Sequence, residues 1–139
     1  GPSALEQQMA QEILARCQHK PVNLIGQTSL KQLMALIKQV QLVVATDTGP
    51  THMATAAGVP VIGLYAHHNP ERTGPYRCRE QVVSVYAQLI EAEQGKPVAQ
   101  LPWRSRLKDP VAMAYITPAM VISRFDQLCH QLALCKEPA

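Results

Sequence analysis

The residues from Asp47 to His52 combine several groups that can bind a ligand. In order they are Asp47, Thr48, Gly49, Pro50, Thr51 and His52. An aspartate oxygen accepts hydrogen bonds from sugar hydroxyls, whereas a threonine hydroxyl and an imidazole can donate to a phosphate. Glycine permits close approach of the backbone to a ligand, and the N–H groups at a helix start favour an anion. The stretch therefore predicts a site for a phosphate and a sugar.

A purely structural role fits the same residues. An Asp or Thr ahead of a helix that begins with proline is a common N-cap, and a glycine there can serve the turn alone. On residue spacing by itself, capping is the better interpretation of the two.

The elements around this stretch alternate between strand and helix. Strands are predicted at residues 22–25, 42–46, 61–65 and 82–86. The runs at 42–46 and 61–65 are almost continuously apolar, which is typical of parallel strands buried on both faces. Between them a short helix is expected over 50–57, ended by Gly58. The pattern predicts a doubly wound α/β sheet, in which ligands bind at the carboxyl ends of strands.

Three further helices and a long loop complete the expected layout. Apolar residues recur at helical spacing over 4–18, then in a helix that begins near Ser29 and is capped by Thr28 or Ser29. A final helix begins at Thr117 and Pro118, where Thr caps and Pro fits the first turn. Residues 94–110 are rich in Gly, Pro and basic side chains, which predicts a surface loop.

The composition favours one soluble domain. The chain has 139 residues, 47% of them hydrophobic, and a net charge of +3. Neither an apolar run of about 20 residues nor a signal-peptide pattern is visible, so a cytoplasmic location is expected. Nucleic-acid binding is disfavoured because aromatic residues are few and no helix carries a basic stripe. Four cysteines without a CxxC pair are expected to be reduced thiols: Cys17, Cys78, Cys129 and Cys135.

Other polar clusters have competing interpretations. The basic residues fall into two groups, Arg72 with Arg77 and Arg79, and Arg104 with Arg106 and Lys108. A solvated face is favoured over contact with an anion or a membrane surface. For His67 and His68, an exposed or substrate-edge loop is favoured over a metal site. Trp103 is interpreted as a packing anchor rather than a platform for a sugar.

Two neighbouring strings carry a recognisable pattern: 47–54 matches D-[ST]-G-x-x-H-x-A, and 56–65 contains G-x-P-x-[IV]-x-[LIV]-[FY]. In these segments the chain resembles the family of ADP-heptose:lipopolysaccharide heptosyltransferases. Ser3–Glu6 and Gly26–Leu30 are similar to two further family segments, so the resemblance covers about residues 1–76. Ala66 and the loop His67-His68-Asn69 depart from the family pattern.

The resemblance implies a fold and a set of donor contacts. The fold would be the Rossmann-like C-terminal half of a GT-B glycosyltransferase, with residues 1–139 as one partial domain. Asp47 would contact heptose hydroxyls, and His52 would assist the phosphate or sugar contact. The residues expected to line the ADP pyrophosphate are Thr48, Gly49 and Pro50. The residues expected on the adenosine side are Thr28, Ser29 and Leu30.

The resemblance also implies what lies outside this chain. The family's catalytic aspartate belongs to an N-terminal domain, and a phosphate-binding lysine precedes the first residue here. We therefore expect no catalytic residue in this chain, no activity from it alone, and no metal or other cofactor.

The expected function is an inverting transfer of heptose from ADP-L-glycero-D-manno-heptose to the lipopolysaccharide inner core. Because that acceptor is embedded in a membrane, we also expect peripheral contact with the cytoplasmic face of the inner membrane. The candidate contact residues are Arg104, Arg106 and Lys108. Two alternatives stay open. One is a GT-B transferase for another donor, such as UDP-N-acetylglucosamine, and the other is a non-catalytic nucleotide-binding module.

Overall fold

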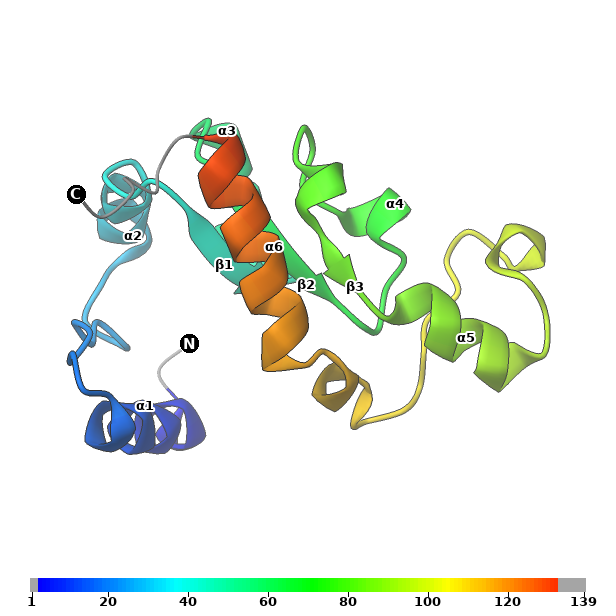
Figure 1. The fold of residues 1–139 in the computed structure, drawn as a ribbon, viewed down its shortest axis with the longest axis horizontal. Coiled ribbons are helices and arrows are strands. Elements are labelled where there is room, and N and C mark those ends of the chain that lie inside the picture. The colour runs from blue at the N-terminus through cyan, green and yellow to red at the C-terminus, as the bar shows by residue number, and fades with distance from the viewer. Residues whose placement is uncertain (1–2, 133–139) are drawn as a thin grey trace. The chain divides into compact units, whose positions relative to one another are not determined.

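The computed structural model describes residues 3–132, so the predicted thiol of Cys135 lies outside this range. The chain divides into two compact units, Gly1–Leu36 and Ile37–Ala139. Figure 1 shows the elements of both units. No helix among the described residues is long and apolar enough to cross a bilayer.

The first unit contains two helix starts that the sequence predicts. Helix α1 (Ala4–Arg16) opens with a capping box in which the Glu6 N–H donates to the Ser3 hydroxyl and the Ser3 N–H donates to the Glu6 carboxylate. Helix α2 (Leu30–Ile37), which crosses into the second unit, begins after Ser29. Ser29 and Gln32 form the same reciprocal pair, at 3.3 and 2.8 Å.

The strand predicted at 22–25 is absent from the structure. Local hydrogen bonds turn the chain there instead: the Ile25 N–H donates to the Asn23 side chain and the Gln27 N–H to the Leu24 carbonyl. An asparagine that bonds the backbone two residues on favours a turn over an extended ladder. The strand predicted from this apolar run is therefore wrong.

The second unit is built on a parallel sheet in the order β1-β2-β3. Its strands are β1 (Val43–Thr46), β2 (Val61–Tyr65) and β3 (Val83–Ser84). The central strand β2 is buried on both faces, as predicted. The same prediction is wrong for β1, where Val44 is 47% exposed. Among the described residues β1 pairs with β2 alone, so it is an edge strand.

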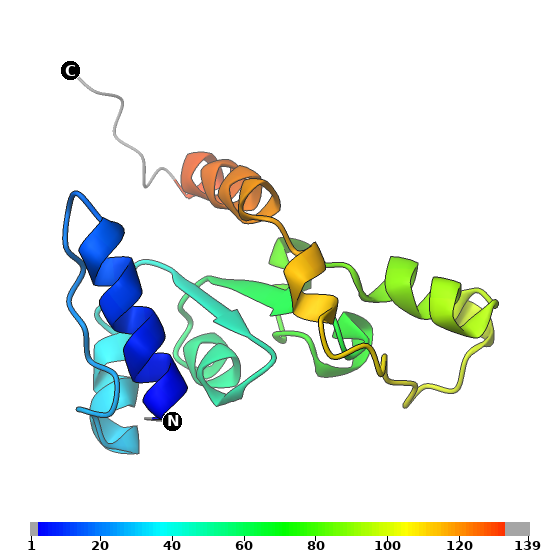
Figure 2. The same cartoon turned by 90° about the horizontal axis from the view of Figure 1, so that it is seen from below.

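Two helices pack on opposite faces of this sheet, as Figures 1 and 2 show. Helix α6 (Pro118–Gln131) is capped by the Thr117 hydroxyl, and its Leu128 packs against Ile62 and Val83. Helix α3 (Gly49–Ala56) contacts β1 and β2. It ends where predicted, because Gly58 adopts a positive φ of 75°.

The chain after β3 contains more helical structure than its composition predicts. The strand expected at 82–86 ends at Ser84, and helix α5 (Tyr86–Gln94), which was not predicted, begins directly after it. Within the segment interpreted as a surface loop, Val98–Gln100 form a 3₁₀ turn.

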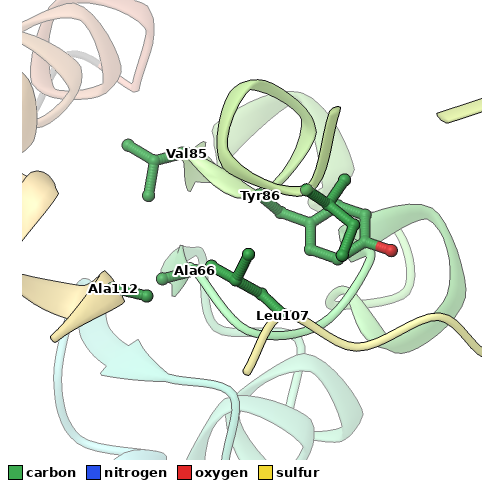
Figure 3. Close-up of a cluster of buried hydrophobic side chains, with 6 residues drawn as sticks. Ala66, Val85, Tyr86, Leu107 and Ala112 are labelled. Carbon is green, nitrogen blue, oxygen red and sulfur yellow. The ribbon is translucent and has the colours of Figure 1, made fainter. Parts of the chain in front are cut away.

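Leu107 anchors that segment in a second hydrophobic core. It is 2% exposed and packs with the other buried members of the cluster, which are Ala66, Val85, Tyr86, Ile90 and Ala112 (Figure 3). The Tyr86 hydroxyl also donates to the Ser105 carbonyl at 2.9 Å. Trp103, by contrast, is 61% exposed, so its interpretation as a packing anchor is wrong.

Candidate functional site

A cavity opens where the carboxyl ends of β1 and β2 meet. Asp47 follows β1 directly, and the chain after β2 passes through His67 and His68 into the short helix α4 (Pro70–Thr73). The cavity has a volume of about 250 Å³. It is lined by Thr46, Asp47, Leu64, Ala66, His67, His68, Arg106 and Met113. Its location is the one expected for a ligand site in an open α/β sheet.

The Asp47 carboxylate is held by side chains from the chain after β2. Its Oδ2 accepts a hydrogen bond from the Thr73 hydroxyl at 2.9 Å and lies 3.0 Å from His68 Nδ1. Its Oδ1 lies 4.0 Å from Nε2 of His52, which belongs to the first turn of α3. The carboxylate is thus oriented through one oxygen, while the other can accept a hydrogen bond from a ligand.

Tyr65 supports this arrangement from the sheet. It is 1% exposed, and its hydroxyl donates to the Thr73 carbonyl at 3.0 Å. Burial, reinforced by the negative charge of Asp47, raises the pKa of Tyr65. The phenol therefore stays protonated at neutral pH and remains a donor that holds Thr73 beside Asp47.

The start of α3 is not capped by a side chain. Thr48 occupies the N-cap position in an extended conformation but makes no capping hydrogen bond. Its hydroxyl donates instead to the Thr46 carbonyl at 3.2 Å, and the Thr51 hydroxyl donates to the same carbonyl at 2.6 Å. The capping interpretation, favoured on spacing alone, is therefore wrong. The positive end of the helix dipole is left open to an anion.

Gly49 leaves open space at the same helix start. A Cβ built on it would meet no atom within 4 Å. The glycines with positive φ are Gly26, Gly58 and Gly95, so the turn at 49 does not need glycine for its conformation. Neither packing nor backbone geometry explains this glycine, and a ligand can approach the backbone closely there.

The structure brings together only part of the predicted site. Asp47 and His52 lie side by side, and Thr48, Gly49 and Pro50 form the adjoining turn and the start of α3. The residues predicted on the adenosine side are Thr28, Ser29 and Leu30, which belong to the first unit. The cavity and the partners of Asp47 are therefore formed by the second unit alone.

Three residues at the site are not among those assigned to donor binding from the sequence, which places His68 only in a loop that is exposed or at the substrate edge. They are Thr73, His68 and Arg106. The sequence feature that could have placed two of them is the order of the elements, because side chains that follow neighbouring parallel strands meet at one edge of the sheet. This argument applies to His68 and Thr73. It does not apply to Arg106, which is 59 residues beyond Asp47. The burial of Leu107 and the β-bridge between Arg106 and His68 bring that part of the chain back to the site.

Two other polar side chains singled out in the sequence have protein partners. His67 Nε2 lies 3.0 Å from the Asp109 carbonyl, and Arg79 pairs with Glu71 at 3.8 Å. Within residues 3–132, no group of three or more His, Cys, Asp or Glu side chains is arranged to hold a metal ion. The thiols of Cys17 and Cys78 form no disulfide among the described residues.

Comparison with known proteins decides the family. The model of glycosyltransferase family 9, described as heptosyltransferase, matches residues 1–103. The chain belongs to glycosyltransferase family 9. The matched region contains Asp47, His52, His68 and Thr73, whereas Arg106 lies beyond it.

Similarity to individual heptosyltransferases agrees with this result. The chain is 46% identical over 127 residues to the lipopolysaccharide core heptosyltransferase OpsX of Haemophilus influenzae, covering 91% of this chain and 37% of that protein. It is 29% identical over 133 residues to lipopolysaccharide heptosyltransferase 2 of Escherichia coli, covering 93% of this chain and 36% of that protein.

A solved family 9 structure shares the fold. The crystal structure of the glycosyltransferase family 9 protein from Veillonella parvula aligns with a TM-score of 0.64 at 22% identity, covering 93% of this chain and 35% of that one. The parallel α/β architecture predicted from the sequence is thus confirmed as that of a GT-B glycosyltransferase. The chain spans only slightly more than a third of the length of these three proteins.

Proposed function

We propose that this chain is the donor-binding part of a heptosyltransferase, which transfers heptose from ADP-L-glycero-D-manno-heptose to the inner core of lipopolysaccharide. The observation that carries the proposal is the Asp47 carboxylate, held through Oδ2 by Thr73 and His68 beside the uncapped start of α3. A sugar diphosphate needs both features: an acceptor for sugar hydroxyls and an electropositive place for the diphosphate.

In the proposed reaction, the acceptor hydroxyl oxygen forms a bond to the anomeric carbon of heptose while the bond from that carbon to the ADP oxygen breaks. The proton of the hydroxyl passes to a base outside this chain, and the configuration at the anomeric carbon inverts. Asp47 orients the sugar, and His52 assists at its edge. The N–H groups at the start of α3, beside Thr48, Gly49 and Pro50, stabilise the charge that develops on ADP. Thr28, Ser29 and Leu30 are proposed for the adenosine side.

The membrane part of the proposal concerns the acceptor. Lipopolysaccharide precursors are held in a bilayer, and exposed cations attract the anionic cytoplasmic surface of a membrane. Arg104 and Lys108 are both exposed on the chain after α5. We propose that they contribute to peripheral contact with the cytoplasmic face of the inner membrane.

Donor competition tests the proposed function. The full-length protein that carries this chain should transfer heptose from ADP-heptose to a heptose-deficient lipopolysaccharide core, and ADP should inhibit the transfer far better than UDP. The product is measured by mass spectrometry of the core. Transfer of N-acetylglucosamine from its UDP derivative, with no product from ADP-heptose, would contradict the proposal.

Replacement of Gly49 by alanine should separate binding from stability. The free energy of unfolding should stay the same or rise by up to about 1 kcal/mol, because the site has room and φ is ordinary. The ADP affinity should fall about tenfold, since a methyl group would occupy the space next to the bound phosphate. Thermal denaturation and calorimetric titration with ADP measure the two effects. An unchanged ADP affinity would show that no ligand approaches this backbone.

A further inference from the structure

Arg106 differs from the other basic residues of its cluster in its position. Arg104, Arg106 and Lys108 are all exposed, but only Arg106 lines the cavity that also contains Asp47 and His68. A uniform solvated face does not explain this difference. Arg106 therefore lies at the carboxyl edge of the sheet, at the site proposed for the donor.

Backbone contacts with the chain after β2 hold Arg106 in this position. Arg106 forms an antiparallel β-bridge with His68, and the Leu107 N–H donates to the His67 carbonyl at 3.0 Å. The next side chain, Leu107, is buried in the core shown in Figure 3. A side chain presented from a fixed backbone loses less conformational entropy on binding than one on a free loop.

Arg106 is the one arginine or lysine among the residues that line this cavity, so it is the permanent cation available there to an incoming anion. Oδ2 of Asp47 already has two partners, Thr73 and His68. Within residues 3–132, the Arg106 guanidinium forms no ion pair. A guanidinium presents a planar set of donors that matches the oxygens of a phosphate.

We propose that Arg106 contacts a phosphoryl group of the donor's diphosphate and stabilises the negative charge of the departing nucleoside diphosphate. This inference rests on the proposed function and adds to it a binding residue from the chain beyond α5. The role is electrostatic, so it applies to both the bound donor and the released product.

The test measures ADP and adenosine affinities of the full-length protein by calorimetry. Arg106→Gln should weaken ADP binding about tenfold or more and leave adenosine binding unchanged, because adenosine carries no phosphate. Arg106→Lys should lie between wild type and Arg106→Gln, since lysine keeps the charge but not the fork of donors. Arg104→Gln and Lys108→Gln are matched controls that remove the same charge outside the cavity, and they should bind ADP like the wild type.

Several results would overturn the inference. An equal loss of ADP and adenosine affinity in Arg106→Gln would assign the residue a structural role. Unchanged ADP affinity with a raised KM for the core acceptor would place the guanidinium on an anionic group of the acceptor. If the wild-type protein bound no ADP, the proposed function would fail first; if it bound ADP and Arg106→Gln did so equally well, only the inference about Arg106 would fail.

Discussion

Asp47→Asn in the full-length protein is expected to lower kcat/KM for heptose transfer by about 100-fold or more. The amide is nearly isosteric but carries no charge and has one acceptor oxygen in place of two. With a single oxygen, the amide cannot bond Thr73 and His68 through one oxygen and accept a hydrogen bond from a sugar hydroxyl through a second. Loss of charged hydrogen bonds costs about 1.5–3 kcal/mol each, and about 3 kcal/mol corresponds to the expected factor.

The control for this substitution is Asp126→Asn. Asp126 is exposed on α6, outside the residues that line the cavity, so the same chemical change there should leave kcat/KM unaltered. Initial rates with ADP-heptose, together with circular dichroism of both variants, give the comparison. Equal rates for Asp47→Asn and wild type would remove Asp47 from the site.

Leu107→Ala should lower the free energy of unfolding of this chain by about 2–4 kcal/mol. The side chain is 2% exposed and packs with Ala66, Tyr86 and Ala112, so truncation removes apolar contacts and leaves a cavity. Denaturation in urea, followed by circular dichroism, measures the change. If Leu107 lay in a surface loop, as the sequence predicts, the same substitution would change the free energy of unfolding by less than about 0.5 kcal/mol.

Ile122→Ala provides the matched control for this stability measurement. Ile122 belongs to α6 and is 58% exposed, so its truncation should cost less than about 1 kcal/mol. A loss at Leu107 no larger than the loss at Ile122 would contradict the second core. It would also remove the anchor that fixes Arg106 at the cavity.

The sequence predicts the framework of the fold where two signals agree. For β2 an apolar run is bounded by Gly58 and a polar loop, and for α6 helical periodicity coincides with the Thr117 cap and Pro118. Where only one signal is present the prediction is wrong in whole or in part. The run at 22–25 is apolar but contains Asn23, whose side chain turns the backbone, and no strand forms. The run at 42–46 forms the predicted strand β1, but the predicted burial on both faces is wrong, and β1 is an edge strand among the described residues.

The site is predictable as far as it is local in sequence. Asp47, Gly49 and His52 share one strand–turn–helix unit, so spacing alone places them together. Thr73 reaches Asp47 through strand pairing, which the sequence implies only after the sheet order is known. Arg106 depends on the burial of Leu107 in a segment whose composition resembles a loop, and this tertiary contact has no local signature.

Binding of ADP at the start of α3 is the central claim, and an amide NMR titration of the full-length protein tests it most directly. ADP should shift the amide signals of Thr48, Gly49 and His52, and UDP at the same concentration should shift them far less. Saturable shifts at these three residues would locate the nucleotide as proposed. Binding of ADP that leaves all three signals unmoved, or stronger shifts with UDP, would contradict the account.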